Sequence, residues 1–257
     1  MDDKKITTRE HYIPVNDEER EKLLQECEWA LKKARKPIEY VLTFDRLIRC
    51  KNELPPDKFM YYYCAFSRKS YNQNRKNNDY EMMEGDIDGE LNTLLRKRIL
   101  LPEKMIRWWN RNIDEYFTHA YMDHLWDGDK DNPGIHRYPE TIANYLILLM
   151  DPELGWYNPK KAFPLICFFL PLSKKGTEET IYPILAYLQS YCLYYGLGTS
   201  RNIPYAFKVI RSITKEERDL YNKNRAHMNY DHQIIELSKT IAHAAYKPYK
   251  PKQENKN

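Results

Sequence analysis

The densest set of side chains that could do chemistry lies in an acidic stretch near the middle of the chain. Asp127, Asp129 and Asp131 have the i, i+2, i+4 spacing of the first ligands in a calcium-binding loop. However, Asn132 stands where that loop needs its sharp-turn glycine, and Tyr138 stands where it needs a bidentate glutamate. An exposed acidic turn is therefore the favoured interpretation, and we predict no metal site.

Two pairs of histidines each have a step of five residues, His119 with His124 and His227 with His232. A step of five places two side chains on different faces of a helix, whereas a step of four lets both reach one metal ion. The favoured interpretation is surface or half-buried histidine. The acidic residues near the first pair still leave a helical hydrolase or nuclease as an alternative function. Its candidate residues are Asp123, His124, Asp127 and Asp129.

A third candidate is the glycine pair Gly196 and Gly198, which begins like a phosphate-binding loop. Arg201 stands where such a loop needs its third glycine, and no predicted strand precedes it. No nucleotide or other cofactor is therefore predicted. The pair is better explained as the closing turn of a helix.

Tyrosine is the most unusual feature of the composition, with 22 residues against only 8 glycines. Tyr187, Tyr191, Tyr194 and Tyr195 crowd one predicted helix, and the spacing puts the first three on a common face. Tyrosine and tryptophan give large contact areas and dominate interface hot spots, although helical aromatic stripes also fill cores. The predicted partner-binding residues are Tyr145, Trp156, Tyr187, Tyr191 and Tyr194.

The elements that carry these residues are predicted by an internal repeat. Ala143 precedes Gly155 by 12 residues, Ala186 precedes Gly198 by the same 12, and the copies are 43 residues apart. A period of about 20–50 residues is typical of stacked repeat proteins. In each copy, small alanines allow close helix packing, a glycine closes the first helix, and an asparagine with a nearby proline begins the second. Each copy therefore predicts a helix–turn–helix hairpin.

The repeat resembles the Sel1-like repeat, a relative of the tetratricopeptide repeat, with copies at about 135–173 and 178–213. The matching positions are Ala143, Leu146, Gly155 and Ala162 in the first copy, and Ala186, Gly196, Gly198 and Ala206 in the second. Ile147 and Glu153 stand where the pattern expects glycine. The resemblance implies a right-handed α-solenoid that binds a protein. It also implies bacterial roles that include scaffolding and the neutralisation of toxins by immunity proteins.

Helical spacing recurs along the rest of the chain and sustained alternation is absent, so the predicted fold class is all-α. We expect an N-terminal helical region at 1–126, a repeat region with capping helices at 135–246, and a frayed tail at 247–257. The break between the first two is the acidic stretch 127–134. Residues 68–88 are so polar that they predict a loop.

Composition narrows the function further. The net charge of +4 arises from 41 basic and 37 acidic residues, which is no footprint for nucleic acid. RNA binding through aromatic stacking is therefore only a weaker alternative. Five dispersed cysteines, no signal peptide and no membrane-spanning run favour a cytoplasmic protein with reduced thiols. We therefore predict a non-enzymatic protein-binding chain, whose partner is a protein such as a toxin and whose oligomeric state is left open.

Overall fold

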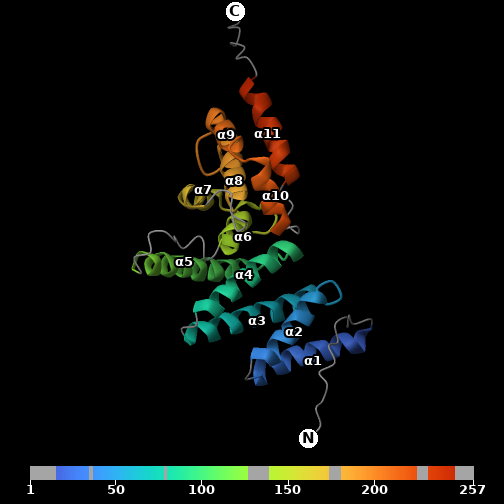
Figure 1. Cartoon of the computed structure of the whole chain (residues 1–257). Coiled ribbons are helices and arrows are strands. Elements are labelled where there is room, and N and C mark those ends of the chain that lie inside the picture. The colour runs from blue at the N-terminus through green and yellow to red at the C-terminus, as the bar shows by residue number, and fades with distance from the viewer. Residues whose placement is uncertain are drawn as a thin grey trace, which may run out of the picture. The chain divides into compact units, whose positions relative to one another are not determined.

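The computed structural model describes residues 16–34, 37–77, 80–126, 139–173, 181–224 and 231–246. In these ranges every regular element is helical, which confirms the all-α prediction (Figure 1). The helices of the first half are α1 (Asp17–Lys33), α2 (Pro37–Arg49), α3 (Pro56–Lys76), α4 (Tyr80–Lys97) and α5 (Glu103–Trp126). Those of the second half are α6 (Pro139–Met150), α7 (Pro159–Phe169), the 3₁₀ turn η2 (Leu170–Leu172), α8 (Tyr182–Tyr195), α9 (Ile203–Ile210), α10 (Lys215–Asn224) and α11 (Asp231–Tyr246).

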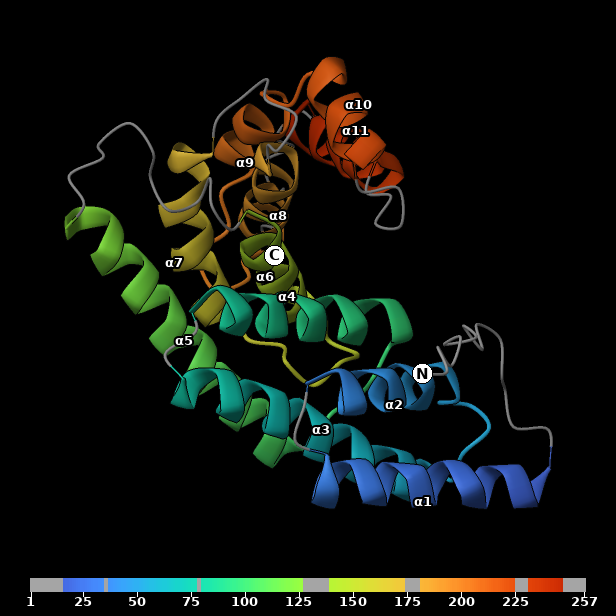
Figure 2. The ribbon, with the colours of Figure 1, turned by 60° about the horizontal axis from the view of Figure 1, so that its bottom comes forward.

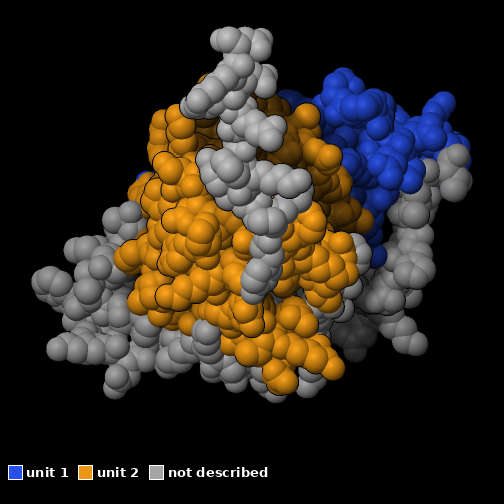
Figure 3. All heavy atoms as spheres, turned by 90° about the horizontal axis from the view of Figure 1, so that it is seen from above, with its two compact units in different colours: residues 1–90 blue, residues 91–257 orange. Residues whose placement is uncertain are grey.

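The chain forms two compact units, residues 1–90 and 91–257, which divide inside α4 (Figure 3). The predicted break at 127–134 lies outside the described residues, and α5 belongs to the second unit instead of an N-terminal region 1–126. The reason is that α5 bonds to the helices that follow it. Tyr145 on α6 donates to Asn110 Oδ1 at 2.6 Å, and Lys161 on α7 pairs with Asp114 at 2.7 Å. The predicted tail at 247–257 also lies outside the described residues.

The first unit begins with α1, whose N-terminus is capped by the side chain of Asn16. Asn16 Oδ1 accepts a hydrogen bond from the Glu19 amide at 2.9 Å, so one free amide of the first turn is satisfied. The buried residues of α1 are Leu23, Cys27 and Ala30, whose steps of four and three place them on one face. That face belongs to the core that α1 forms with α2 and α3.

A polar seam joins α3 to α4, and it overturns the predicted loop at 68–88. Ser67 Oγ donates to Glu90 Oε2 at 2.9 Å, Ser70 Oγ donates to Asp86 Oδ1 at 2.6 Å, and Asn74 Nδ2 donates to Asp86 Oδ2 at 2.7 Å. Two polar residues of this stretch, Ser70 and Asn74, therefore face a neighbouring helix that carries a matching carboxylate. The prediction was wrong because it treated polarity as a sign of solvent exposure.

The second unit contains the two predicted hairpins, α6/α7 and α8/α9, whose helices contact each other within each pair. The four alanines of the pattern, Ala143, Ala162, Ala186 and Ala206, are all buried. Helix α8 lies at the centre of this unit and contacts α6, α7, α9, α10 and α11 (Figure 2). Small side chains at these sites let the helix backbones approach one another, as the repeat pattern requires.

Both hairpins use the same hydrogen bonds to enter their second helix. The Asn158 amide donates to the Leu149 carbonyl at 2.8 Å, and the Asn202 amide donates to the Leu193 carbonyl at the same distance. Each asparagine side chain then caps the helix, accepting from Lys161 N at 3.1 Å and from Tyr205 N at 3.0 Å. These caps agree with the predicted role of the two asparagines.

Glycines shape the hairpin turns, with one correction. Gly196, with φ of 74°, is the left-handed residue that closes α8, whereas the sequence assigned that role to Gly198. Gly198 is also left-handed, at φ of 69°, but glycine is needed there because the Pro159 backbone lies close by. A Cβ at Gly198 would overlap the Pro159 carbonyl oxygen. Gly155, at φ of 75°, is less constrained, because a Cβ there would meet only the side-chain ends of Leu100 and Ile106, 3.1 and 3.2 Å away.

Helices α10 and α11 cover the second hairpin. Ile234, Leu237 and Ile241 of α11 are buried in one cluster with residues of α8 and α9, whereas Ala245 near the end of α11 is exposed. No described helix combines the length and apolar character that a membrane crossing requires.

Candidate binding groove

The side chains that suggested hydrolytic or metal-binding chemistry lie outside the part of the chain whose side chains the structure describes. Asp127, Asp129, Asp131 and His227 lie outside the described residues. His119, Asp123, His124 and His232 lie on α5 and α11, where their side chains are not described. Among the side chains that are described, no three histidine, cysteine, aspartate or glutamate residues come close enough to hold a metal ion.

Tyr145 and Trp156, two of the predicted partner-binding residues, lie in the core of the second unit. Their exposed fractions are 1% and 2%, and their rings meet edge to face with centroids 6.3 Å apart. The Tyr145 phenol also donates to Asn110, and burial raises the pKa of this phenol above its usual value. Buried rings offer no surface to another chain, so we remove both from the proposed binding surface.

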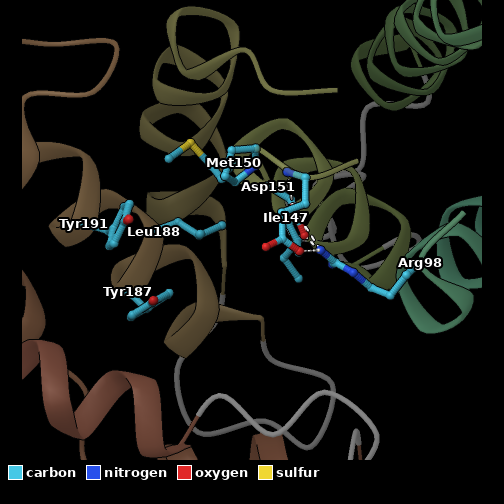
Figure 4. Close-up of a pocket in the computed structure, with 9 residues that line it drawn as sticks. Arg98, Ile147, Met150, Asp151, Tyr187, Leu188 and Tyr191 are labelled. Carbon is cyan, nitrogen blue, oxygen red and sulfur yellow. Dashed lines mark hydrogen bonds and ion pairs between the residues drawn. The ribbon is translucent and has the colours of Figure 1, made fainter. Parts of the chain in front are cut away.

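Tyr187 and Tyr191 line a groove on the second unit, with a volume of about 310 Å³ (Figure 4). It is bounded by the end of α4, the end of α6 with its loop, and one face of α8. Its lining residues are Arg98, Ile147, Met150, Asp151, Pro152, Glu153, Tyr187, Leu188 and Tyr191. Arg98 and Asp151 lie on one side, and Tyr187, Leu188 and Tyr191 lie on the other. The groove is therefore hollowed between a charged wall and an aromatic wall.

The charged wall is built around Arg98. Its guanidinium donates from both terminal nitrogens to Asp151 and from Nη2 to Glu153 Oε2 at 2.6 Å. These bonds, first of all the one to Asp151, raise the pKa of Arg98 above its usual value. Asp151 Oδ1 also accepts from the Glu153 amide at 2.9 Å, which fixes the acidic loop after α6.

The backbone at Arg98 is shaped to support this wall. Arg98 is the one described residue other than glycine with a positive φ, at 50°. The Ile99 amide reaches back to the Leu94 carbonyl, as the Leu197 amide reaches back to Cys192 beside Gly196. Thus α4 ends in the same left-handed turn as α8, but with an arginine where glycine is preferred, at a cost of about 1 kcal/mol. Its ion pairs offset part of that cost.

The aromatic wall is a ladder of tyrosines along α8. The ring centroids of Tyr187 and Tyr191 are 6.1 Å apart, and those of Tyr191 and Tyr195 are 4.6 Å apart. Burial, reinforced by the neighbouring phenols, raises the pKa of Tyr187 to about 12. Burial also raises the pKa of Tyr191. Exposure increases along the ladder, since Tyr187 and Tyr191 are half-buried and Tyr195 is 52% exposed.

Tyr194, the remaining predicted binding residue, does not line the groove. The Arg201 guanidinium lies 5.3 Å from the centre of its ring, and Arg201 Nε donates to the Tyr194 carbonyl at 2.9 Å. Helical spacing placed Tyr194 beside Tyr187 and Tyr191, but the ladder continues to Tyr195 instead. In the structure, Tyr194 lies in the last turn of α8, where its ring meets that of Tyr195 with centroids 4.8 Å apart.

The whole chain was compared with protein-family models, with curated proteins and with solved structures. None matched. The candidate site is therefore identified from the structure of this chain alone.

Sequence reasoning missed the charged wall entirely. Arg98 is 53 residues from Asp151, and nothing local connects them. A signal was nevertheless present, because Glu153 stands 43 residues before Gly196, so the first copy has a charged residue where the second has glycine, and Glu153 lines the groove.

Proposed function

We propose that the chain is a non-enzymatic protein-binding α-solenoid of the Sel1-like type. The α8 groove, defined by the nine lining residues above, would hold a segment of a partner protein, and Tyr195 would extend the contact beyond its edge. Tyrosine side chains suit this role because they combine a large apolar ring with a polar tip and lose little entropy on contact.

The observation that carries this proposal is the exposure pattern of α8. Ten of its residues are buried, and the others are Tyr187, Tyr191, Tyr194 and Tyr195. A central helix whose only accessible side chains are tyrosines is unusual, since core helices normally leave polar groups at their exposed edge. Three of the four rings form one continuous ladder beside a hollow, which is the arrangement expected of a hot spot.

The resemblance to Sel1-like repeats makes neutralisation of a bacterial toxin the specific form that we favour. A scaffolding role would use the same surface. In both cases the partner would be held by aromatic contacts at the groove and by charged residues around it.

Affinity capture tests the proposal directly. The tagged chain would be used to isolate partners from its native cells, and Tyr191→Ala and Tyr195→Ala would be compared with the wild type. We expect one stoichiometric partner, whose recovery falls at least about tenfold with either variant, since hot-spot truncations cost about 2 kcal/mol.

Tyr61→Ala is the matched control, because Tyr61 is 66% exposed and lies on α3 of the other unit. Recovery of the partner should not change with this variant. A binding site on α8 would be contradicted if both Tyr191→Ala and Tyr195→Ala recovered as much partner as the wild type does. Loss of the partner with Tyr61→Ala alone would contradict it as well.

A further inference from the structure

The charges that line the α8 groove do not balance. Among its lining residues, Asp151 and Glu153 carry negative charge and Arg98 alone carries positive charge. Helix α8 contributes no charged residue at all. The groove therefore holds one excess negative charge, although the whole chain has a net charge of +4.

The carboxylates of Asp151 and Glu153 differ in their exposure and in how many of their oxygens accept hydrogen bonds. Asp151 has a 16% exposed side chain, and its oxygens accept from the Arg98 guanidinium and from the Glu153 amide. Glu153 has a 77% exposed side chain, and only its Oε2 accepts from Arg98. Its other carboxylate oxygen can accept a further charged donor at the edge of the groove.

The tyrosine wall on the opposite side of the groove also favours a positively charged group. The faces of tyrosine rings attract cations, most strongly where water is partly excluded. Tyrosine phenols are neutral at physiological pH, because their pKa is about 10 even when they are unperturbed, so the rings of Tyr187 and Tyr191 add no competing charge. The chain itself contains a comparable contact, because the Arg201 guanidinium lies 5.3 Å from the centre of the Tyr194 ring.

We infer that the partner enters the α8 groove with an arginine or lysine side chain, which lies between the tyrosine wall and the Glu153 carboxylate. This inference depends on the proposed protein-binding function and adds the chemistry of the bound residue. Charge complementarity selects a basic side chain over an acidic one, and the ring faces hold its aliphatic stem.

The test is selection of random 12-residue peptides displayed on phage against the immobilised full chain. Peptides that bind the wild type but not Tyr191→Ala are assigned to the α8 groove. We expect these peptides to share one arginine or lysine position. Groove peptides that lack a shared basic position would overturn the inference but leave the protein-binding function standing. If Tyr191→Ala selects the same peptides as the wild type, both proposals fail.

A second measurement locates the partner of the basic residue. The strongest arginine peptide and its citrulline counterpart, which is neutral and of similar shape, would be titrated into wild type and variants. We expect citrulline to weaken binding by about tenfold, as the loss of a charge-assisted contact implies. Glu153→Gln should weaken the arginine peptide by about threefold to tenfold and leave the citrulline peptide unchanged.

Arg98→Gln should act in the opposite direction. It removes the guanidinium that competes for Asp151 and Glu153, so we expect the arginine peptide to bind severalfold more tightly. Two results would overturn the conclusion that the basic peptide residue binds at this carboxylate pair. One is that Glu153→Gln weakens both peptides equally, and the other is that Arg98→Gln binds the arginine peptide more weakly than the wild type does. Circular dichroism of each variant would show that the fold is retained.

Discussion

The two hairpins of the second unit share a frame but differ in what they expose. Both enter their second helix through an asparagine whose amide bonds to a leucine carbonyl at 2.8 Å. In the first hairpin, residues 141–150 of α6 are all buried, whereas α8 of the second leaves four tyrosines accessible, namely Tyr187, Tyr191, Tyr194 and Tyr195. The shared frame explains packing, and the difference locates the candidate site on α8.

The turns of the two hairpins differ in the same sense. The first turn carries the acidic pair Asp151 and Glu153 and is anchored by the buried ring of Trp156. The second turn carries Gly196 and Gly198 and has no aromatic residue between Leu197 and Arg201. The first hairpin thus supplies the charged wall of the groove, and the second supplies the aromatic wall.

The largest expected effect is on the anchor of the first turn. Trp156→Ala should lower the free energy of unfolding by about 3–5 kcal/mol, because it leaves a large cavity around Tyr145. Tyr195→Ala on the second hairpin should cost less than about 0.5 kcal/mol, because that ring is exposed. Urea unfolding followed by circular dichroism measures both. Similar costs for the two variants would erase the distinction between anchor and binding surface.

The next largest effects are expected at the two turn glycines, Gly198 and Gly155, which should differ in how much stability an alanine costs. Gly198→Ala should cost about 3 kcal/mol, since the new Cβ would overlap the Pro159 carbonyl, which is backbone and cannot rotate away. Gly155→Ala meets only the ends of the Leu100 and Ile106 side chains, 3.1 and 3.2 Å away, and should cost about 1–2 kcal/mol. The same unfolding measurement applies, and a larger loss at Gly155 would contradict this account of the turns.

The shared frame predicts equal and smaller effects. Asn158→Ala and Asn202→Ala each remove one cap, so each should cost about 1 kcal/mol of unfolding free energy. Substitution of either asparagine by aspartate preserves the acceptor and should restore most of that stability. A cost confined to one of the two alanine variants would show that the hairpins do not share their capping.

An effect of similar size is expected at the aromatic wall at alkaline pH. Because the pKa of Tyr187 is raised to about 12, the folded state holds that proton more tightly than the unfolded state does. Its contribution to stability is therefore complete below pH 10 and is lost as the pH rises toward 12. Between pH 9 and pH 11, the wild type should lose about 1 kcal/mol more than Tyr187→Phe. Parallel losses in the two proteins would place Tyr187 in solvent.

Local patterns in the sequence predicted most of the hairpin frame, because caps, alanines and glycines act through their immediate neighbours. The helices at 68–88 were missed because Ser70 and Asn74 satisfy their polar groups on Asp86 of another helix. Such pairing is invisible without the tertiary structure.

The site was predictable only in part. Tyr187 and Tyr191 were identified from their spacing, but the same reasoning selected Tyr145 and Trp156, which are core residues. Aromatic residues follow the helical period whether they face a core or a partner, so spacing cannot separate the two. Arg98 could not be found, because its role depends on a contact across 53 residues.

Photo-crosslinking tests the central claim that α8 is the binding surface. The photoreactive residue p-benzoylphenylalanine would replace Tyr195 in one variant and Tyr61 in another, and each would be irradiated with the captured partner. We expect a covalent adduct from position 195, with none from position 61. An adduct from position 61 alone would contradict the claim and move the binding surface to the first unit.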